Sequence, residues 1–238
     1  MVGSRSGVVN MAGKSNGNKG TPTDASGEKS TRSRIFDVSV DLFAQKGFDA
    51  VTMQEIADAV GIKKASLYYH FESKDRILDE ILSYPMQRLG EIGGEVGAYN
   101  EQLIVSDGLE GFLARSQEVV LSWMETPYIE KIMRIIFVEL YHNDRIKEFF
   151  GKAVLDAASV FWEQNFAIMM RHGLITEKDP RVLMGEYLSF YSHTWMEYFL
   201  FRYGRTAGNY RQEYEDQLSE HTRYMVWALK PEADGCKS

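Results

Sequence analysis

The chain has little cysteine and no long hydrophobic run, and these absences exclude several classes of protein. Its 238 residues include one cysteine, Cys236, so no intrachain disulfide can form and a reducing, cytoplasmic location is expected. No stretch approaches the roughly 18 to 20 uninterrupted apolar residues of a membrane span, and the N-terminus lacks the apolar segment of a secretion signal. We therefore expect a globular protein without a membrane partner, whose 44% apolar content suffices for a core.

The chain also lacks an excess of positive charge. Its net charge of −7 argues against a protein that coats nucleic acid indiscriminately, because such binding relies on cations that contact phosphates. Residues 28–76 carry eight basic and eight acidic side chains, whereas residues 77–238 carry sixteen basic and twenty-five acidic ones. The acidity therefore lies in the C-terminal two thirds.

The first 29 residues are rich in Gly, Ser, Asn, Lys and Thr and poor in large apolar side chains. Such a segment cannot bury enough surface to offset the entropy of ordering, so we expect a disordered tail over 1–29 and a flexible C-terminus over 233–238. The tail contains GVVNMAGKS, residues 7–15, but five residues separate its glycines where a P-loop has four, and no strand precedes it. A phosphate-binding loop is therefore not expected there.

From Ser30 onward the apolar residues recur at helical spacing, and the alternation typical of strands is absent. The stripe Ile35, Val38, Leu42 and Phe43 predicts a first helix that ends at Lys46-Gly47. Further start and stop signals predict three short helices in the N-terminal part: one from the capping box Thr52/Glu55 to Gly61, one over 63–70, and one from Ser73 to Pro85, which breaks or bends it.

After a glycine-containing link over about 90–108, five more helices are expected. Their predicted limits are about 109–124, Thr126-Pro127 to about Tyr141, Asp144 to Arg171, Asp179-Pro180 to Gly204, and Asn209 with Gln212 to Pro231. The predicted fold class is all-α.

Two short helices joined by a turn at Gly61 form a helix-turn-helix, whose second helix is shaped to enter the major groove of DNA. Leu67 and Phe71 are four residues apart and share the buried face, whereas Lys64, Ala65 and Tyr68 lie on a neighbouring face. A lysine there can donate to a guanine edge or a phosphate, and a tyrosine to phosphate oxygens. The alternative is that Tyr68 and Tyr69 are core aromatics, although two adjacent residues cannot both face one core.

The run TMQEIADAVGIKKASLYYHFESKDRIL resembles the DNA-binding signature of the TetR family of one-component transcriptional regulators, and the similarity covers residues 33–79. The resemblance implies DNA contacts at the start of the second helix and along the third, with phosphate clamps at its end. Together with Lys63 and Tyr69, which belong to the same stretch, the expected contacts are Thr52, Gln54, Lys63, Lys64, Ala65, Ser66, Tyr68, Tyr69, His70 and Lys74. Acidic Glu72 and Asp75 beside Lys74 depart from the pattern.

The resemblance also implies a domain plan. It predicts an N-terminal three-helix, helix-turn-helix DNA-binding domain over 30–76 and a C-terminal helical ligand-binding and dimerisation domain over 77–232. The last two helices, about 181–203 and 210–229, would form a four-helix interface with a second copy. The expected function is a repressor that binds a palindromic operator in double-stranded DNA as a homodimer and leaves it when a small-molecule inducer binds.

The C-terminal part is rich in methionine and aromatic residues, most of which we expect in the core or the dimer contact. Such side chains also line adaptable apolar pockets, and the resemblance implies an inducer site that accepts an apolar or amphipathic molecule. The predicted lining residues are Trp123, Phe137, Tyr141, Trp162, Phe166, Met170, Tyr191, His193 and Trp195, with His193, Arg134 and Glu139 as possible polar anchors. The helix containing Pro85 would transmit binding to the DNA by pivoting there, unless Pro85 ends it.

Two other functions are open at this point. A helical bundle can hold a di-iron centre through two Glu-x-x-His pairs, but only Glu139 and His142 have this spacing, so we expect neither an enzyme nor a cofactor. A regulator that needs no ligand, or a helical scaffold, is the second alternative, and a scaffold leaves Lys64 and Tyr68 unexplained.

Overall fold

The computed structural model describes residues 30–95, 100–176, 178–202 and 210–231, and the described chain is helical without a strand. The all-α prediction is confirmed. The predicted tail, the predicted C-terminus, Gly204 and Asn209 lie outside the described residues. The helices are α1 Thr31–Lys46, α2 Met53–Val60, α3 Lys64–His70, α4 Lys74–Glu95, α5 Glu101–Met124, α6 Ile129–Glu139, α7 Asp144–Phe149, α8 Ala157–Arg171, α9 Pro180–Met196 and α10 Tyr210–Ala228, with π-helical turns η1 Phe150–Asp156 and η2 Glu197–Phe201.

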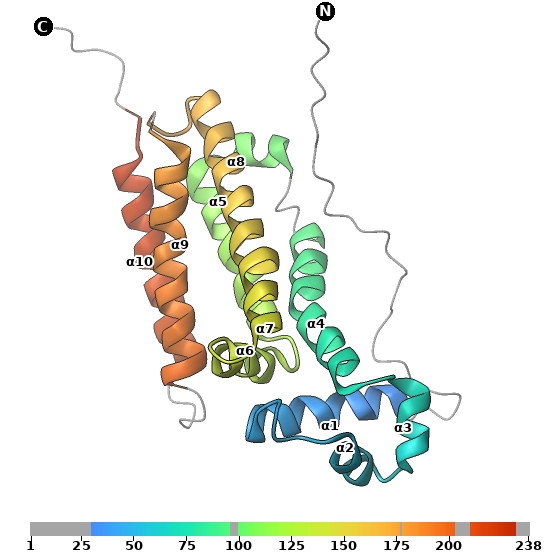
Figure 1. The fold of residues 1–238 in the computed structure, drawn as a ribbon. Coiled ribbons are helices and arrows are strands. Elements are labelled where there is room, and N and C mark those ends of the chain that lie inside the picture. The colour runs from blue at the N-terminus through green and yellow to red at the C-terminus, as the bar shows by residue number, and fades with distance from the viewer. Residues whose placement is uncertain (1–29, 96–99, 177, 203–209, 232–238) are drawn as a thin grey trace, which may run out of the picture.

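Helices α1, α2 and α3 lie together at the foot of the molecule, and α4 leads upward from them to the C-terminal helices (Figure 1). The predicted ends of α1 and α2 are confirmed, because Gly47 and Gly61 directly follow these helices and close them with backbone hydrogen bonds. The Thr52 hydroxyl accepts a hydrogen bond from the Glu55 backbone N–H at 3.2 Å, and the Ser73 hydroxyl accepts one from Arg76 N–H at 3.2 Å. These side chains fix where α2 and α4 begin.

The buried face of α1 differs from the predicted stripe. Ile35 and Phe43 are buried, but Val38 and Leu42 are only half-buried. The buried arc instead includes Phe36, Ser39 and Val40. The reason is that α1 contacts α2 and α4 as well as α6, so its buried arc is wider than a stripe facing a single partner.

The alternative that Pro85 ends α4 is wrong, as is the predicted link over 90–108. Helix α4 continues through Pro85 to Glu95, and α5 begins at Glu101. Proline lacks the N–H that would bond to the carbonyl of Ile81, yet the helix is held there by its neighbours. Pro85 is buried, and the indole N–H of Trp123 on α5 donates to the Pro85 carbonyl at 2.8 Å.

The predicted starts of α5 and α6 are also corrected. Gly108, with φ 66 and ψ −167, interrupts α5 just before the expected start at residue 109, but a helical segment precedes it. Helix α6 begins at Ile129, two residues after Pro127, because Tyr128 is held at φ 71. The Tyr128 hydroxyl donates to Asp37 Oδ1 at 2.6 Å, and its ring packs edge-on against Phe36, so contacts with α1 offset the cost of this conformation.

The helix predicted over Asp144 to Arg171 is confirmed in extent but contains the π-helical turn η1. The Asp179 carboxylate accepts from the N–H of Arg181 and begins α9, as predicted. Helices α5, α8, α9 and α10 stand as an upright bundle, with α9 and α10 at its outer edge (Figure 1). Aromatic residues fill this bundle, including Phe112, Phe166 and Tyr187.

A second core joins the foot of the molecule to the lower part of the bundle. It contains the buried residues of α1 to α4 together with those of α6, Trp123 and Phe199. The Glu139 carboxylate, buried at the end of α6, accepts a hydrogen bond from the Phe48 backbone N–H at 2.8 Å. Gly47 is needed beside it, because its φ is 84 and a Cβ there would lie 3.0 Å from Glu139 Oε1. The boundary at residues 76 and 77 remains a proposal, since this core extends beyond it into α4.

Replacing Glu139 with alanine removes the acceptor from the buried Phe48 N–H. We expect the free energy of unfolding to fall by about 1–3 kcal/mol, the usual cost of an unpaired buried donor. Urea denaturation of both proteins measures this. The control is Glu130→Ala, an exposed carboxylate on the same helix, which should change stability by less than about 0.5 kcal/mol. Equal effects of the two variants would contradict the role of Glu139.

Replacing Leu67 with alanine tests the anchor of α3. Leu67 is fully buried, so truncation should lower the free energy of unfolding by about 2–5 kcal/mol. Tyr69, two residues away and 88% exposed, provides the control: Tyr69→Ala should leave stability nearly unchanged. Denaturation followed by circular dichroism distinguishes them, and a loss of stability in the tyrosine variant instead would mean that α3 packs with its other face.

Candidate DNA-binding site

The site is built on the angle between α2 and α3, which the turn at Gly61 fixes. Gly61 has φ 78 and ψ 35, a left-handed conformation that favours glycine. The N–H groups of Gly61 and Ile62 both donate to the Ala57 carbonyl at 3.0 Å, which closes α2 in the manner of a Schellman cap. The chain then enters α3 directly, so the two helices form the predicted helix-turn-helix.

Helix α3 has one buried and one exposed face, as the sequence predicts. Leu67 within the helix and Phe71 directly after it are buried in the N-terminal core. The remaining predicted contacts of this helix project outward: Lys64, Ala65, Ser66, Tyr68 and Tyr69 are all exposed. The alternative that both tyrosines are core aromatics is therefore wrong.

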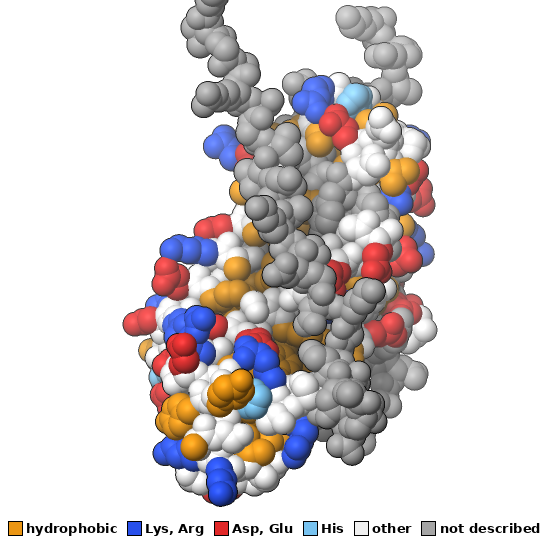
Figure 2. Space-filling view, turned by 90° about the vertical axis from the view of Figure 1, so that its right-hand side faces the viewer, with side chains coloured by type: hydrophobic (Ala, Val, Ile, Leu, Met, Phe, Trp, Pro, Cys, Tyr) orange, Lys and Arg blue, Asp and Glu red, His pale blue; other side chains and the backbone are white. Residues whose placement is uncertain are grey.

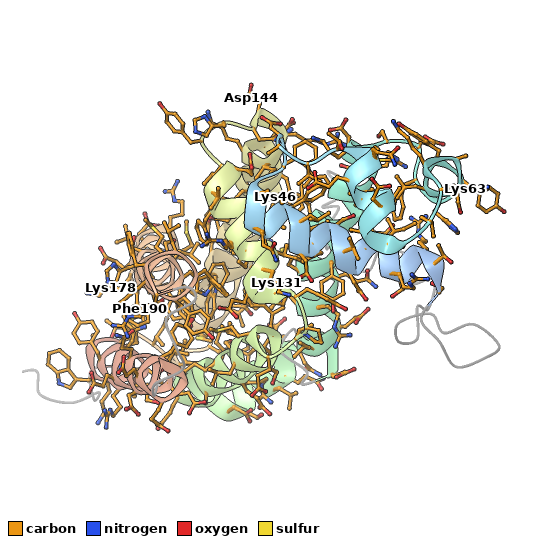
Figure 3. The ribbon with its side chains drawn as sticks, turned by 90° about the horizontal axis from the view of Figure 1, so that it is seen from below. Lys46, Lys63, Lys131, Asp144, Lys178 and Phe190 are labelled. Carbon is orange, nitrogen blue, oxygen red and sulfur yellow. The ribbon has the colours of Figure 1, made fainter. Side chains whose placement is uncertain are left out.

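The first residues of α2 lie beside the start of α3. Thr52 is exposed, and the Gln54 amide donates to Asp58 Oδ1 at 2.7 Å, which holds it along α2. An open hollow between the two helices is lined by Gln54, Asp58, Gly61, Ile62, Lys63 and Lys64. Three of the predicted contacts, Gln54, Lys63 and Lys64, therefore border one concave surface. Figure 3 shows Lys63 on the side of the molecule opposite to Phe190 and Lys178 of the bundle.

The charges around this surface leave two lysines without ionic partners. Neither Lys63 nor Lys64 makes an ion pair with a described residue, whereas Lys46 pairs with Glu55. The hydrogen bond from Lys46 lowers the pKa of the Glu55 carboxyl below its usual value. On the face that carries α3, Lys and Arg side chains lie near hydrophobic side chains and a histidine at the lower end of the molecule (Figure 2). This arrangement suits a surface that meets phosphates and bases together.

His70 lies at the end of α3 and is half-buried. Its ring makes an edge contact with Tyr69, and its backbone carbonyl accepts a hydrogen bond from Arg32 at 2.6 Å. Its role as a phosphate contact remains a proposal.

Lys74 occupies a different place from that expected of a phosphate clamp. Its ammonium donates to the carbonyls of Phe48 at 2.8 Å and Val51 at 2.9 Å, with a longer contact to Asp49 at 3.4 Å, and it lies 4.2 Å from the centre of the Phe48 ring. An ammonium group has three donors, and these carbonyls use them. Lys74 therefore holds the loop between α1 and α2, and we remove it from the expected DNA contacts.

Sequence reasoning missed two arginines that position the site. From the first turns of α1, Arg34 donates to the Val60 carbonyl at the end of α2, and Arg32 donates to the His70 carbonyl at the end of α3. The Arg32 guanidinium also lies 4.0 Å from the centre of the Phe71 ring. The sequence holds one signal for their role. Two cations lie in the first turns of a helix, near the positive end of its dipole, where they are unfavourable unless other groups bind them.

The predicted inducer-site residues do not form one set. Trp123 belongs to the core shared with the N-terminal helices, and Phe137 packs against it, whereas Trp162, Phe166 and Tyr191 belong to the core of the upright bundle, with Met170 at its edge. Trp195 contacts both cores.

Four of the candidates for the inducer site are corrected. Tyr141 is 88% exposed and His193 is also exposed, so neither faces the interior. Glu139 accepts from Phe48, and Arg134 donates to the Ala44 carbonyl at 3.2 Å, so both contact the N-terminal domain. Helical spacing predicts that these segments are helices, but it does not predict which partner each side chain faces.

Metal sites and membrane-spanning helices are both absent from the described residues. In the described ranges, no three His, Cys, Asp or Glu side chains lie close enough together to hold a metal ion. Among the helices that the structure describes, none is both long and apolar enough to cross a bilayer.

Comparison with known proteins matches the N-terminal helices to a family. Residues 35–81 match the model of the bacterial regulatory proteins, tetR family. Over 87 residues the chain is 41% identical to the HTH-type transcriptional repressor KstR2 of Rhodococcus jostii; this match covers 37% of the chain and 39% of KstR2. The chain thus spans well under half the length of this relative.

Solved structures extend the similarity of fold to the C-terminal helices. A putative TetR-family transcriptional regulator from Mesorhizobium loti has a TM-score of 0.61 at 18% identity, covering 83% of this chain and 96% of that one. A putative transcriptional regulator from Saccharomonospora viridis, solved in complex with choline, has a TM-score of 0.56 at 18% identity, covering 82% and 95% of the two chains. At this identity the likeness concerns the fold alone. The N-terminal helices, through residues 35–81, are thus similar to the bacterial regulatory proteins of the tetR family.

Proposed function

We propose that this protein is a one-component transcriptional repressor that binds a palindromic operator in double-stranded DNA as a homodimer and is released by an apolar or amphipathic small molecule. The observation that carries the proposal is the outward face of α3, where Lys64, Ala65, Ser66 and Tyr68 are exposed beside a helix-turn-helix angle fixed at Gly61. The similarity of residues 35–81 to a family of regulatory proteins, and of 87 residues to a transcriptional repressor, supports a regulator over the enzyme alternative.

The residue types on α3 suit entry into the major groove. Ala65 and Ser66 are small and allow close approach, Lys64 can donate to a guanine edge or a phosphate, and Tyr68 can donate to a phosphate oxygen. Arg32 and Arg34 on α1 donate to backbone carbonyls at the ends of α3 and α2. The exposed face of α3 therefore needs little reorganisation when DNA binds. We include Thr52, Gln54, Lys63, Tyr69 and His70 in the proposed contacts.

A second copy is proposed because one α3 of seven residues offers few base contacts. Two such helices about 34–36 Å apart would read successive major grooves. The outer edge of the bundle offers a surface for the second copy, since Trp227 and Tyr224 on α10 and Val182 and Met196 on α9 are exposed. A large aromatic residue that is 75% exposed, as Trp227 is, suits the centre of a protein interface.

The effector would act through α4, which enters both halves of the molecule. Its first turns contribute Ile77, Leu78 and Ile81 to the N-terminal core. At Pro85 its carbonyl is bonded by Trp123, and the Trp123 ring stacks on Trp195 with centroids 5.6 Å apart. A small molecule that moves these tryptophans would shift α4 if it prefers the shifted arrangement by a few kcal/mol. The choline complex of the neighbour from Saccharomonospora viridis supports the proposal of a small-molecule effector. A regulator that needs no ligand is the alternative.

Binding to DNA should be specific and sensitive to salt. Duplexes selected by the protein from a random pool should be palindromic and should bind more tightly than scrambled duplexes of the same composition. If roughly six phosphates are contacted, affinity should fall by about a thousandfold between 50 and 200 mM salt, because counterions are released on binding. Fluorescence anisotropy measures both effects, and equal affinity for selected and scrambled duplexes would contradict the proposal.

Lys64→Ala should weaken binding to the selected duplex by about 1–3 kcal/mol if Lys64 contacts a base, and should relax the preference at that base pair. The matched control is Lys178→Ala, an exposed lysine on the opposite side of the molecule (Figure 3). The control should bind like the unmodified protein. Unchanged affinity of the Lys64 variant would show that a different face of α3 meets DNA.

Trp227→Glu should dissociate the homodimer, because it places a charge in the proposed interface on α10. We expect the dimer to weaken by about 2 kcal/mol or more, roughly thirtyfold, in analytical ultracentrifugation. Tyr141→Glu serves as control, since Tyr141 is an exposed aromatic residue outside α9 and α10, in the turn between α6 and α7. Dissociation by the control but not by the Trp227 variant would place the interface elsewhere.

A further inference from the structure

A hydrogen bond on the surface of α2 orients the side chain of Gln54. The Gln54 amide donates through Nε2 to Asp58 Oδ1 at 2.7 Å, and both side chains are exposed. Both also line the open hollow between α2 and the start of α3, together with Lys63 and Lys64. The bond therefore lies on the surface that is proposed to meet DNA, and it involves Asp58, a residue outside the proposed contacts.

Asp58 occupies a position that is unfavourable for an acidic side chain. It lies in the last turn of α2, where a negative charge opposes the helix dipole. On a surface that approaches DNA, a carboxylate also repels phosphates. Asp58 makes no ion pair with a described residue, although Lys63 and Lys64 border the same hollow. The hydrogen bond from Gln54 is therefore the favourable direct contact that the described residues offer the Asp58 carboxylate.

This bond decides which groups of the Gln54 amide remain for DNA. A glutamine amide has two N–H donors and one carbonyl acceptor, whereas an ionised carboxylate only accepts. Asp58 therefore takes one N–H and turns the Nε2 end of the amide toward itself. One N–H and the carbonyl of Gln54 are left, and they form an adjacent donor and acceptor.

An adjacent donor and acceptor match the edge of adenine. In the major groove adenine presents the N7 acceptor beside the N6 amino donor, and a glutamine amide can pair with both. Guanine presents two acceptors, N7 and O6, which would need two donors, and Asp58 already occupies one donor of Gln54. We propose that Asp58 is a specificity-determining residue, which fixes the Gln54 amide so that it selects adenine over guanine. The inference rests on the proposed DNA-binding function and assigns one base of the operator.

A hydrogen bond between residues four apart on a helix can also serve the helix alone. In that case the loss of Asp58 would change the stability of α2 and leave the base preference unaltered. Because Asp58 is exposed, its replacement by alanine should leave the protein folded. The base preference of a folded variant therefore separates the two roles.

The experiment compares the unmodified protein with Asp58→Ala, Gln54→Ala and the double variant. Selection from a random duplex pool identifies the base pair that Gln54 reads, as the position where Gln54→Ala loses its preference. Fluorescence anisotropy then measures binding to duplexes that carry adenine or guanine at that position and at its symmetry-related copy.

The unmodified protein should prefer adenine by about tenfold for each copy of the position, as expected of a bidentate pair. Asp58→Ala should lower this preference about fivefold, because the released N–H can then donate to guanine. The same replacement in the Gln54→Ala background should leave the preference unchanged, since the group that Asp58 orients is absent.

Glu72→Ala is the matched control, because Glu72 is an exposed acid of equal charge directly after Phe71. It should shift the affinity for both duplexes alike. The proposal is overturned if Asp58→Ala keeps the full preference, if Gln54→Ala relaxes no position, or if the base that Gln54 selects is not adenine. Equal binding of selected and scrambled duplexes by the unmodified protein would instead contradict the proposed function itself, so the two failures are distinguishable.

Discussion

The hydrogen bond from the Phe48 N–H to the buried Glu139 carboxylate is the polar contact that fixes how the two halves meet in their shared core. It ties the loop after α1 to the end of α6, and two further bonds along α6 and its cap, from Tyr128 to Asp37 and from Lys131 to Asp41, fix α1 alongside it. Because a buried carboxylate is costly without its donor, small shifts of α6 cannot be absorbed locally. The position of the N-terminal helices is therefore set by the C-terminal ones.

Near that contact, three cations of the N-terminal helices and α4 serve as internal supports. Arg32, Arg34 and Lys74 donate to backbone carbonyls at the ends of α2 and α3 and in the loop after α1, where carbonyl groups lack helical partners. This leaves Lys63 and Lys64 as the lysines of the helix-turn-helix that face outward without ion pairs among the described residues. An acidic chain can in this way present a local surface suited to phosphates, because net charge matters less than the position of a few cations.

The C-terminal half combines tight aromatic packing with buried polar groups that bond to one another or to the backbone. Trp123 has its N–H bonded to the carbonyl of Pro85, and its ring stacks on that of Trp195 with centroids 5.6 Å apart. The same group of rings therefore connects the bundle to the helix that carries the N-terminal domain.

The sequence by itself determined the local features of this protein. Caps at Thr52, Ser73 and Asp179, the turn at Gly61, and the buried and exposed faces of α3 follow from short-range spacing, so they could be predicted from neighbouring residues. Only the tertiary structure decided which long-range partner each side chain meets. Lys74 donates to the loop before α2, Pro85 lies inside a helix that Trp123 supports, and Tyr141 faces outward. Each of these outcomes depends on a helix far away in the sequence. Helical periodicity does not specify how such helices are rotated relative to one another.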